Sequence, residues 1–205
     1  MIELSPRYLF RTNVRTLALA ERLAPLMNDM LPKYGIDTPE RVQMFLAQMG
    51  HESDSFTVKE ENLNYSYAGL LAVFPKYYKT EREARLHARK PELIANKVYG
   101  GRMGNTLYGF GYKYLGRGFI QLTGFDNYAA FERDTGLPVT AKPDLLLNDR
   151  EALLAACWFW QKNNLNSFAD KRDVEGCTRA INGGLNGLED RQRRYRFAQM
   201  VAFDD

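Results

Sequence analysis

Two acidic residues near the start of the chain have the spacing of a proton-transfer pair. Glu52 follows an apolar stripe at helical spacing, and Glu61 comes nine residues later. The stripe consists of Val42, Phe45, Leu46 and Met49. A carboxyl group projected from a core-facing stripe is partly desolvated, which raises its pKa and suits a general acid near neutral pH. By spacing alone, a pair of surface acids is the favoured interpretation, because paired acids are common on solvated faces.

The rest of the sequence argues against most other kinds of catalytic chemistry. It has two histidines, His51 and His87, and no Gly-x-Ser-x-Gly motif, which gives a serine triad little support. No Cys/His spacing suggests zinc, and the glycines between residues 100 and 118 form no Lys-containing phosphate loop. We therefore expect neither a metal nor a cofactor. Carboxylates, amides and aromatic rings remain, and these are the groups that carbohydrate enzymes use.

Three further segments carry polar residues that suit a site, and each also has a simpler structural interpretation. Residues 116–124 alternate polar and apolar, which predicts a short extended stretch with Gln121 and Thr123 on one side, or an ordinary edge strand. Asn182 precedes two glycines, a pattern typical of a helix C-cap and turn. Arg191 begins an Arg-rich segment that indicates a solvated helix face, which could also meet anionic envelope polymers.

Helical periodicity dominates the elements that must position these residues. Thr38 before a proline predicts the N-cap of a helix that delivers Glu52. Asn148 predicts a capping-box entry into a buried helix over residues 152–162. Further helices are expected at 17–31, 174–181 and 188–201, with shorter pieces at 68–74 and 81–89. The Tyr-rich segment after Glu61 is expected to form an inserted lobe, with a loop or short hairpin at 100–118.

Composition indicates an ordinary globular protein. The 205 residues are 45% hydrophobic and 26% charged, which suits one domain, or one domain with an inserted lobe. The net charge of +3 does not argue for nucleic acid, and we expect no such partner. The N-terminal segment lacks the pattern of a secretory signal, and no run approaches the roughly 18 apolar residues of a membrane span. We therefore expect synthesis in the cytosol and no stable membrane insertion.

Taken together, the motifs resemble those of a known family. In chain order they are His51-Glu52-Ser53, Gly116-Arg117-Gly118-x-Ile120-Gln121-Leu122-Thr123-Gly124, Asn127-Tyr128, Trp158-Phe159-Trp160, Ile181-Asn182-Gly183-Gly184, Asp190-Arg191 and Tyr195. This pattern resembles the family-19 glycoside hydrolases, the chitinase-like enzymes, over residues 40–200. The short spacing between Glu52 and Glu61 is similar to that of their bacteriophage endolysin branch.

The resemblance implies roles for seven residues. Glu52 matches the general acid and Glu61 the general base that activates water, while Thr123 stands where a hydroxyl helps to hold that water. The amides that line the sugar groove are matched by Gln121, Asn127 and Asn182, and an arginine that pairs with the acids is matched by Arg191. The family inverts the anomeric centre, for which two carboxyls roughly 6.5–9.5 Å apart leave room for a water.

Some positions leave details open. Glu60 adjoins Glu61 and is a rival for the base, and Asp54 is a more distant one. The family often has Gly-Asp-Gly and an Arg where this chain has Gly109-Phe110-Gly111 and Leu115. We therefore expect substrate contacts there to differ from the family norm.

We expect a mainly α, lysozyme-like fold that forms a single catalytic domain, with a small lobe at about residues 62–115 flanking a substrate groove and no separate wall-binding domain. The expected function is that of an endolysin, which hydrolyses the β-1,4 bond between N-acetylmuramic acid and N-acetylglucosamine in peptidoglycan glycan strands. As a monomer it would leave the host cytoplasm through a holin and act on the periplasmic wall. Two alternatives stay open: a chitinase, and a non-catalytic glycan-binding protein.

Overall fold

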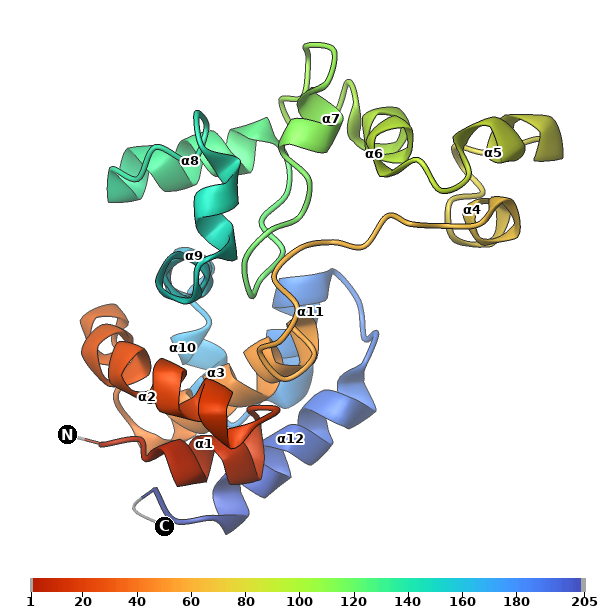
Figure 1. Cartoon of the computed structure of the whole chain (residues 1–205). Helices are drawn as coiled ribbons and strands as arrows, with labels where there is room; N and C mark the ends of the chain where they lie inside the picture. Colours follow the sequence, from red (N-terminus) through yellow and green to blue (C-terminus); the bar gives the residue numbers. More distant parts are fainter. Residues whose placement is uncertain (1, 204–205) are drawn as a thin grey trace. The chain divides into compact units, whose positions relative to one another are not determined.

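The computed structural model describes residues 2–203 and divides the chain into two compact units (Figure 1). The first unit contains the chain up to Lys59, the short segment Gly118–Ile120, and the chain from Leu147 on. The second contains Glu60–Arg117 and Gln121–Leu146. The lobe predicted at about 62–115 lies within the second unit, which also includes the segment after residue 120.

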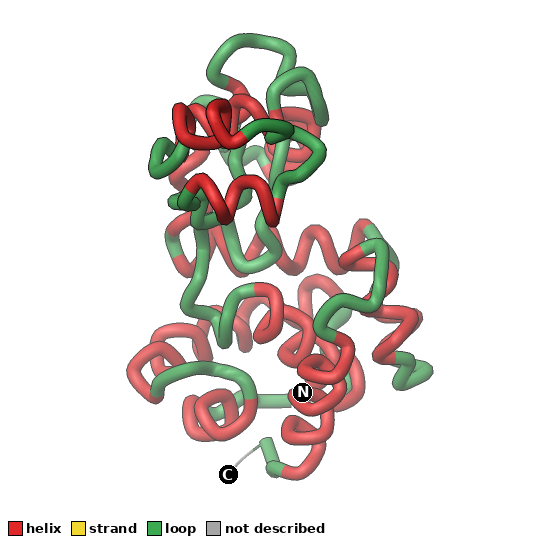
Figure 2. Tube along the Cα trace, turned by 90° about the vertical axis from the view of Figure 1, so that its right-hand side faces the viewer, coloured by secondary structure: helices red, strands yellow, loops and turns green. Residues whose placement is uncertain are grey.

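The structure is mainly helical, as the periodicity predicts. Among residues 2–203 there are helices, turns and isolated β-bridges but no strand (Figure 2). No helix in this part of the chain is long and apolar enough to span a membrane. The first unit is built from α1 (Pro6–Thr12), α2 (Leu17–Met30), the 3-10 turn η1 (Leu31–Tyr34), α3 (Pro39–Glu52), α9 (Asp149–Lys162), α10 (Asn166–Ala169), α11 (Val174–Asn182) and α12 (Leu188–Met200).

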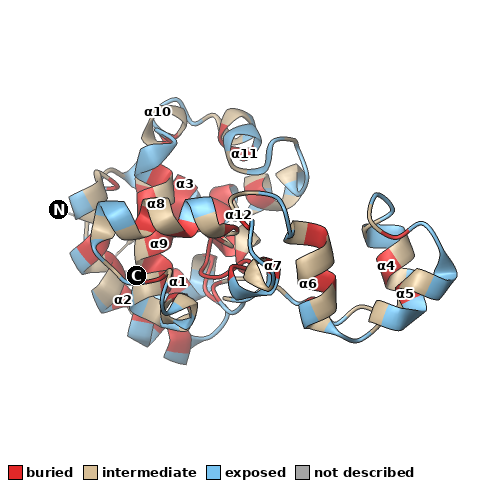
Figure 3. Cartoon of the chain, turned by 90° about the horizontal axis from the view of Figure 1, so that it is seen from above, coloured by how far each residue is buried: buried red, intermediate tan, exposed pale blue. Residues whose placement is uncertain are grey.

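Helix α3 delivers the first carboxylate. The Thr38 hydroxyl accepts a hydrogen bond from the backbone N–H of Arg41, which confirms the predicted N-cap. Residues 44–50 of α3 are all buried, the class that Figure 3 colours red. Helix α3 packs mainly against α12. Glu52 is the last helical residue, and the Ser53 hydroxyl closes the helix by donating to the Met49 carbonyl at 2.6 Å.

The turn after α3 has an uncommon backbone. Asp54, Ser55 and Phe56 follow one another with φ values of 47°, 61° and 65°. Left-handed conformations cost roughly 1–2 kcal/mol per non-glycine residue, so three in a row need external support. Part of that support is the Ser53 hydroxyl, which accepts from the backbone N–H of Phe56 at 3.0 Å.

Helix α9 is the buried helix that the sequence predicts. Half of its 14 residues are buried, and Trp160 packs edge-on against Phe45 of α3 at 5.3 Å between ring centroids. The predicted capping box is wrong, because the Asn148 side chain makes no cap hydrogen bond. Asp149 instead accepts from Lys59 at 2.7 Å and from Arg22 at 3.1 Å, so the start of α9 is tied to neighbouring segments of the first unit.

The second unit has its own small core. It is built from α4 (Tyr67–Val73), α5 (Glu81–His87), α6 (Pro91–Tyr99), α7 (Phe110–Lys113) and α8 (Phe125–Thr135), followed by the 3-10 turn η2 (Pro143–Leu147), whose last residue belongs to the first unit. The core residues are Leu63, Leu70, Tyr78, Ala84, Ile94, Ala95 and Val98. The predicted helical pieces at 68–74 and 81–89 correspond to α4 and α5.

The extended stretch predicted at residues 116–124 is wrong. Arg117 and Leu122 exchange two backbone hydrogen bonds, at 3.1 and 2.8 Å, and the residues between them form a tight turn. Gln121 has a φ of 54°, which no strand residue adopts. Alternation of polar and apolar residues is equally compatible with a turn whose apolar members, Phe119 and Ile120, are buried.

Candidate active site

In the first unit, the candidate residues are centred on an arginine that bridges two residues on one face of α3. Arg191 of α12 is 2% exposed, and its Nη2 donates to Oε1 of Glu52 at 2.5 Å. Its Nη1 donates to Oε1 of Gln48, one helical turn before Glu52, at 2.6 Å. Burying a guanidinium is costly unless it is paired, and the Glu52 carboxyl group and the Gln48 amide oxygen provide its partners.

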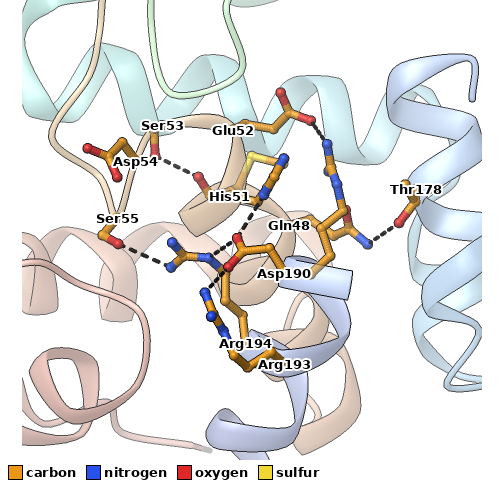
Figure 4. Close-up of polar contacts among 12 residues, drawn as sticks. Gln48, His51, Glu52, Ser53, Asp54, Ser55, Thr178, Asp190, Arg193 and Arg194 are labelled. Atoms are coloured by element: carbon orange, nitrogen blue, oxygen red, sulfur yellow. Dashed lines mark hydrogen bonds and ion pairs between the residues drawn. The ribbon is translucent and has the colours of Figure 1, made fainter. Parts of the chain in front are cut away.

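Gln48 is itself fixed by a third helix. Its Nε2 donates to Oγ1 of Thr178 in α11 at 3.3 Å, and the Thr178 hydroxyl donates to the Val174 carbonyl at 2.7 Å (Figure 4). Because the amide nitrogen points to α11, the amide oxygen must point to Arg191. Helices α3, α11 and α12 therefore all contribute to the position of the Glu52 carboxylate.

A separate group of candidate residues is centred on Glu61 in the second unit. The hydroxyl of Tyr99, the last residue of α6, donates to Oε1 of Glu61 at 2.6 Å. The Gly116 backbone accepts from the Glu61 N–H at 2.9 Å and donates to the Glu61 carboxylate. Burial raises the pKa of Glu61 above its usual range, and the two hydrogen bonds to its carboxylate only partly offset this.

Gly116 also brings two predicted site residues close to Glu61. A Cβ at Gly116 would lie 2.8 Å from Oε1 of Gln121 and 3.1 Å from Oγ1 of Thr123, so only glycine leaves these side chains in place. The Thr123 hydroxyl donates to the Gln121 carbonyl at 2.7 Å. With its hydrogen used there, the Thr123 oxygen is an acceptor for a further donor, such as water.

The two other predicted site amides, Asn127 and Asn182, differ in their surroundings. Asn127 of α8 donates from Nδ2 to the Thr123 carbonyl at 2.7 Å, so it holds the backbone of a site residue. Asn182 is exposed at the C-terminal end of α11, where Gly183 in a left-handed conformation ends the helix as predicted. It is not part of the hydrogen-bonded set around Glu52.

Both rivals for the base are held in ion pairs. Glu60 is about half exposed and pairs with the buried Arg117 at 3.1 Å. Asp54 is exposed and pairs with Arg15. Neither has the burial and neutral donors that surround Glu61, so the surroundings favour Glu61 as the base.

Glu52 belongs to the first unit and Glu61 to the second. The spacing of their carboxyl groups that an inverting reaction requires therefore stays a prediction.

Sequence reasoning did not single out Gln48, Thr178 or Tyr99 as site residues. Gln48 lies four residues before Glu52, and helical spacing alone would have placed it on the same face. Thr178 and Tyr99 had no such signal, because their partners are distant in sequence.

Comparison with known proteins identifies relatives in bacteria and plants. No protein-family model matches the chain. A glycosyl hydrolase family 19 domain-containing protein of Haemophilus influenzae is 45% identical over 177 residues, which cover 85% of this chain and 86% of that protein. Two endochitinases of Arabidopsis thaliana are each 29% identical over 151 residues, 73% of this chain. The matched segment is 42% and 41% of the length of these plant proteins.

Solved structures share the fold. Chitinase C from Streptomyces griseus HUT6037 matches with a TM-score of 0.60 and 19% identity, over 97% of this chain and 76% of that one. A chitinase C mutant matches with a TM-score of 0.62 and 17% identity. At this level of identity, the likeness concerns the fold and confirms the predicted fold class.

Proposed function

This chain belongs to glycosyl hydrolase family 19 and is a glycoside hydrolase, and we propose that it cleaves the β-1,4 bond between N-acetylmuramic acid and N-acetylglucosamine in peptidoglycan. The observation that carries a hydrolytic role is the pairing of Glu52 with the buried Arg191. A general acid that donates its proton becomes a carboxylate, and a buried guanidinium stabilises that product and the charge that develops on the way to it.

The proposed reaction uses two carboxylates in distinct roles. Glu52 gives its proton to the glycosidic oxygen as the bond to the anomeric carbon breaks. Glu61 takes a proton from water, whose oxygen forms the new bond to that carbon from the opposite face. The second hydrogen of this water is donated to the oxygen of Thr123, which the bond from Thr123 to the Gln121 carbonyl leaves as an acceptor.

The surroundings of Glu61 suit the role of base. Burial raises its pKa above the ordinary range, which strengthens it as a proton acceptor. In this proposal Gln121 and Asn182 bind sugar hydroxyl or acetamido groups, and Asn127 holds the backbone of Thr123 beside the groove.

We further propose that the chain is an endolysin of the bacteriophage type. The short spacing between Glu52 and Glu61 supports this assignment, as does the bacterial origin of the relative that matches along most of both chains. In this role the protein would be a monomer, made in the host cytoplasm, released through a holin and active on the periplasmic wall.

A chitinase is the second candidate, because the plant relatives are endochitinases and the solved structures are of a chitinase. Digestion of purified peptidoglycan and of chitin oligomers, followed by identification of the new reducing sugar, separates the two. A new N-acetylmuramic acid end supports the proposal, while cleavage of chitin alone, or a new N-acetylglucosamine end on peptidoglycan, overturns it. The anomeric form of the product, followed by NMR during the reaction, tests inversion.

The non-catalytic alternative is tested by Glu52→Gln. The variant keeps an acceptor for Arg191 but has no proton to transfer, so we expect it to fold and to lose hydrolysis by about 10²- to 10⁴-fold. Wild-type protein that binds glycan and cleaves neither polymer at any pH would favour the binding protein.

A further inference from the structure

A second pair links α3 to α12 immediately beside the bridge between Glu52 and Arg191. His51 precedes Glu52, Asp190 precedes Arg191, and Nδ1 of His51 lies 2.8 Å from Oδ2 of Asp190. Figure 4 shows the His51 ring directed at Asp190. Two successive residues on one helix therefore contact two successive residues on the other.

The Asp190 carboxylate accepts hydrogen bonds from three side chains. Besides His51, Arg194 donates from Nε at 2.7 Å and Arg193 donates to the other oxygen. Burial pushes the pKa of Asp190 up, but the bonds from His51 and Arg194 and the two arginine charges outweigh it and lower the pKa to about 2. An ionised carboxylate only accepts, so Nδ1 of His51 carries the hydrogen in this pair.

The same network reaches the other side of Glu52. Nη1 of Arg194 donates to the Ser55 hydroxyl at 3.1 Å, within the left-handed turn that follows α3 (Figure 4). Asp190 thus connects to the residue before Glu52 directly and to the residue three positions after it through Arg194.

The His51 ring is also held by packing. A Cβ at Gly187, which caps the start of α12 with a φ of 74°, would lie 2.2 Å from two atoms of the ring. The backbone before α12 therefore lies directly against the imidazole, which limits its rotation away from Asp190. Without such constraints the last residue of a helix tends to fray.

We propose that Asp190 is a positioning residue, which through His51 and Arg194 fixes the end of α3 so that Glu52 stays on Arg191. The inference rests on the proposed hydrolysis, in which Glu52 is the proton donor. Displacement of a catalytic group by about 1 Å can lower turnover by ~100-fold, so a small loss of order at this helix end is measurable.

Asp190→Asn tests the proposal, with Asp170→Asn as the matched control. Asp170 accepts two bonds from Arg41, at 2.6 and 2.8 Å, in the same unit but outside the contacts of Glu52. We expect Asp190→Asn to lower kcat by about 10- to 100-fold with little change in KM, and Asp170→Asn to leave kcat unchanged. A kcat of wild-type size in folded Asp190→Asn, judged by thermal unfolding, overturns the proposal.

A second pair of variants separates positioning by His51 from direct chemistry. Asn places an amide nitrogen near the site of Nδ1, so His51→Asn keeps a donor to Asp190, whereas His51→Leu has none. We expect His51→Asn to retain most of kcat and His51→Leu to lose it as Asp190→Asn does. Equal loss in both variants would indicate that the imidazole itself acts chemically and would overturn the proposal.

A crystal structure of Asp190→Asn gives a readout that does not depend on turnover. The proposal requires the Glu52 carboxylate to leave hydrogen-bond distance of Arg191 or to lose order. A Glu52 carboxylate that keeps its wild-type position overturns the inference, even if the wild-type protein cleaves neither polymer. Absence of cleavage by the wild type, in contrast, overturns the proposed function alone.

Discussion

Glu60 and Glu61 are adjacent in sequence, yet their carboxylates have opposite surroundings. Glu60 is about half exposed and pairs with the Arg117 guanidinium at 3.1 Å, while Glu61 is partly buried and accepts from the neutral hydroxyl of Tyr99 at 2.6 Å. The Glu60 carboxylate is therefore held by a cation, whereas partial burial raises the pKa of Glu61. This difference gives the two residues different expected roles.

We expect Glu61→Gln to abolish hydrolysis and Glu60→Gln to preserve it. Loss of a general base lowers turnover by about 10²- to 10⁴-fold, whereas Glu60→Gln keeps an acceptor for the buried Arg117, which also pairs with Asp144 at 3.2 Å. Initial rates on peptidoglycan and thermal unfolding of both variants measure these effects. An inactive Glu60→Gln beside an active Glu61→Gln would move the base to Glu60.

The raised pKa of Glu61 also predicts an effect on stability. The folded state binds the Glu61 proton more tightly than the unfolded state, so ionisation of Glu61 destabilises the fold as pH rises through and above its folded pKa. Gln resembles the protonated acid, so Glu61→Gln should unfold at higher temperature than wild type at pH 7. The gain should vanish below about pH 4.5, the ordinary pKa, where both states are protonated. Unfolding curves across this range check the sign, and an equal gain at all pH values would contradict it.

Tyr99→Phe should move the acidic limb of activity to higher pH. The Tyr99 hydroxyl lowers the pKa of Glu61 against the effect of burial, so its removal raises that pKa further. The pH dependence of kcat/KM reports the shift. Tyr78→Phe is the control, because the Tyr78 hydroxyl bonds to His87 in the same unit, away from Glu61. If the acidic limb of the Tyr99→Phe profile lies at the wild-type pH, the ionisation of Glu61 does not set that limb.

Arg191→Lys should be strongly impaired although it keeps the charge. The guanidinium uses separate nitrogens for Gln48 and Glu52, a fork that a single ammonium does not reproduce. We expect kcat to fall about tenfold or more. Arg41→Lys removes a comparable fork to Asp170 and should leave kcat intact. Equal kcat for both lysine variants would show that the fork at Glu52 is dispensable.

Gly116→Ala tests whether the residues around Glu61 depend on close packing. The added methyl would lie 2.8 Å from the Gln121 amide oxygen and must displace it. We expect weaker substrate binding, seen as a higher KM. We also expect a lower kcat if the methyl displaces the Thr123 side chain. Gly69→Ala in α4 is the matched control, because its new methyl would meet the Ser66 and Tyr65 side chains only at 3.3 Å. Wild-type kinetics in both variants would show that activity does not depend on close packing at Gly116.

The sequence predicts much of the first unit because its signals are local. A cap at Thr38, a helical stripe ending at Glu52 and a glycine after Asn182 depend on neighbours within a few residues. The resemblance to a family implies a pairing of Arg191 with the acids, and the structure places it on Glu52. Helices α1, α6, α7, α8 and α10 were not predicted, because they are short or their apolar periodicity is interrupted by polar residues. Helix α7 lies in the segment 100–118 that was predicted to be a loop or short hairpin.

The second unit was harder to predict. Tyr99 is one of 12 tyrosines, and nothing near it in sequence marks it as the partner of a residue 38 positions away. The turn at Gln121 has the polar alternation of a strand, and a positive φ at a glutamine has no signature in composition. Such features depend on tertiary contacts.

The left-handed turn at Asp54, Ser55 and Phe56 has opposite consequences for stability and for turnover. A screen for heat resistance alone would favour glycine at Ser55, because glycine removes about 1 kcal/mol or more of backbone strain. The same change removes the hydroxyl to which Arg194 donates, so the backbone that follows Glu52 is held less firmly. Engineering for durability and engineering for turnover would therefore select different residues at this one position.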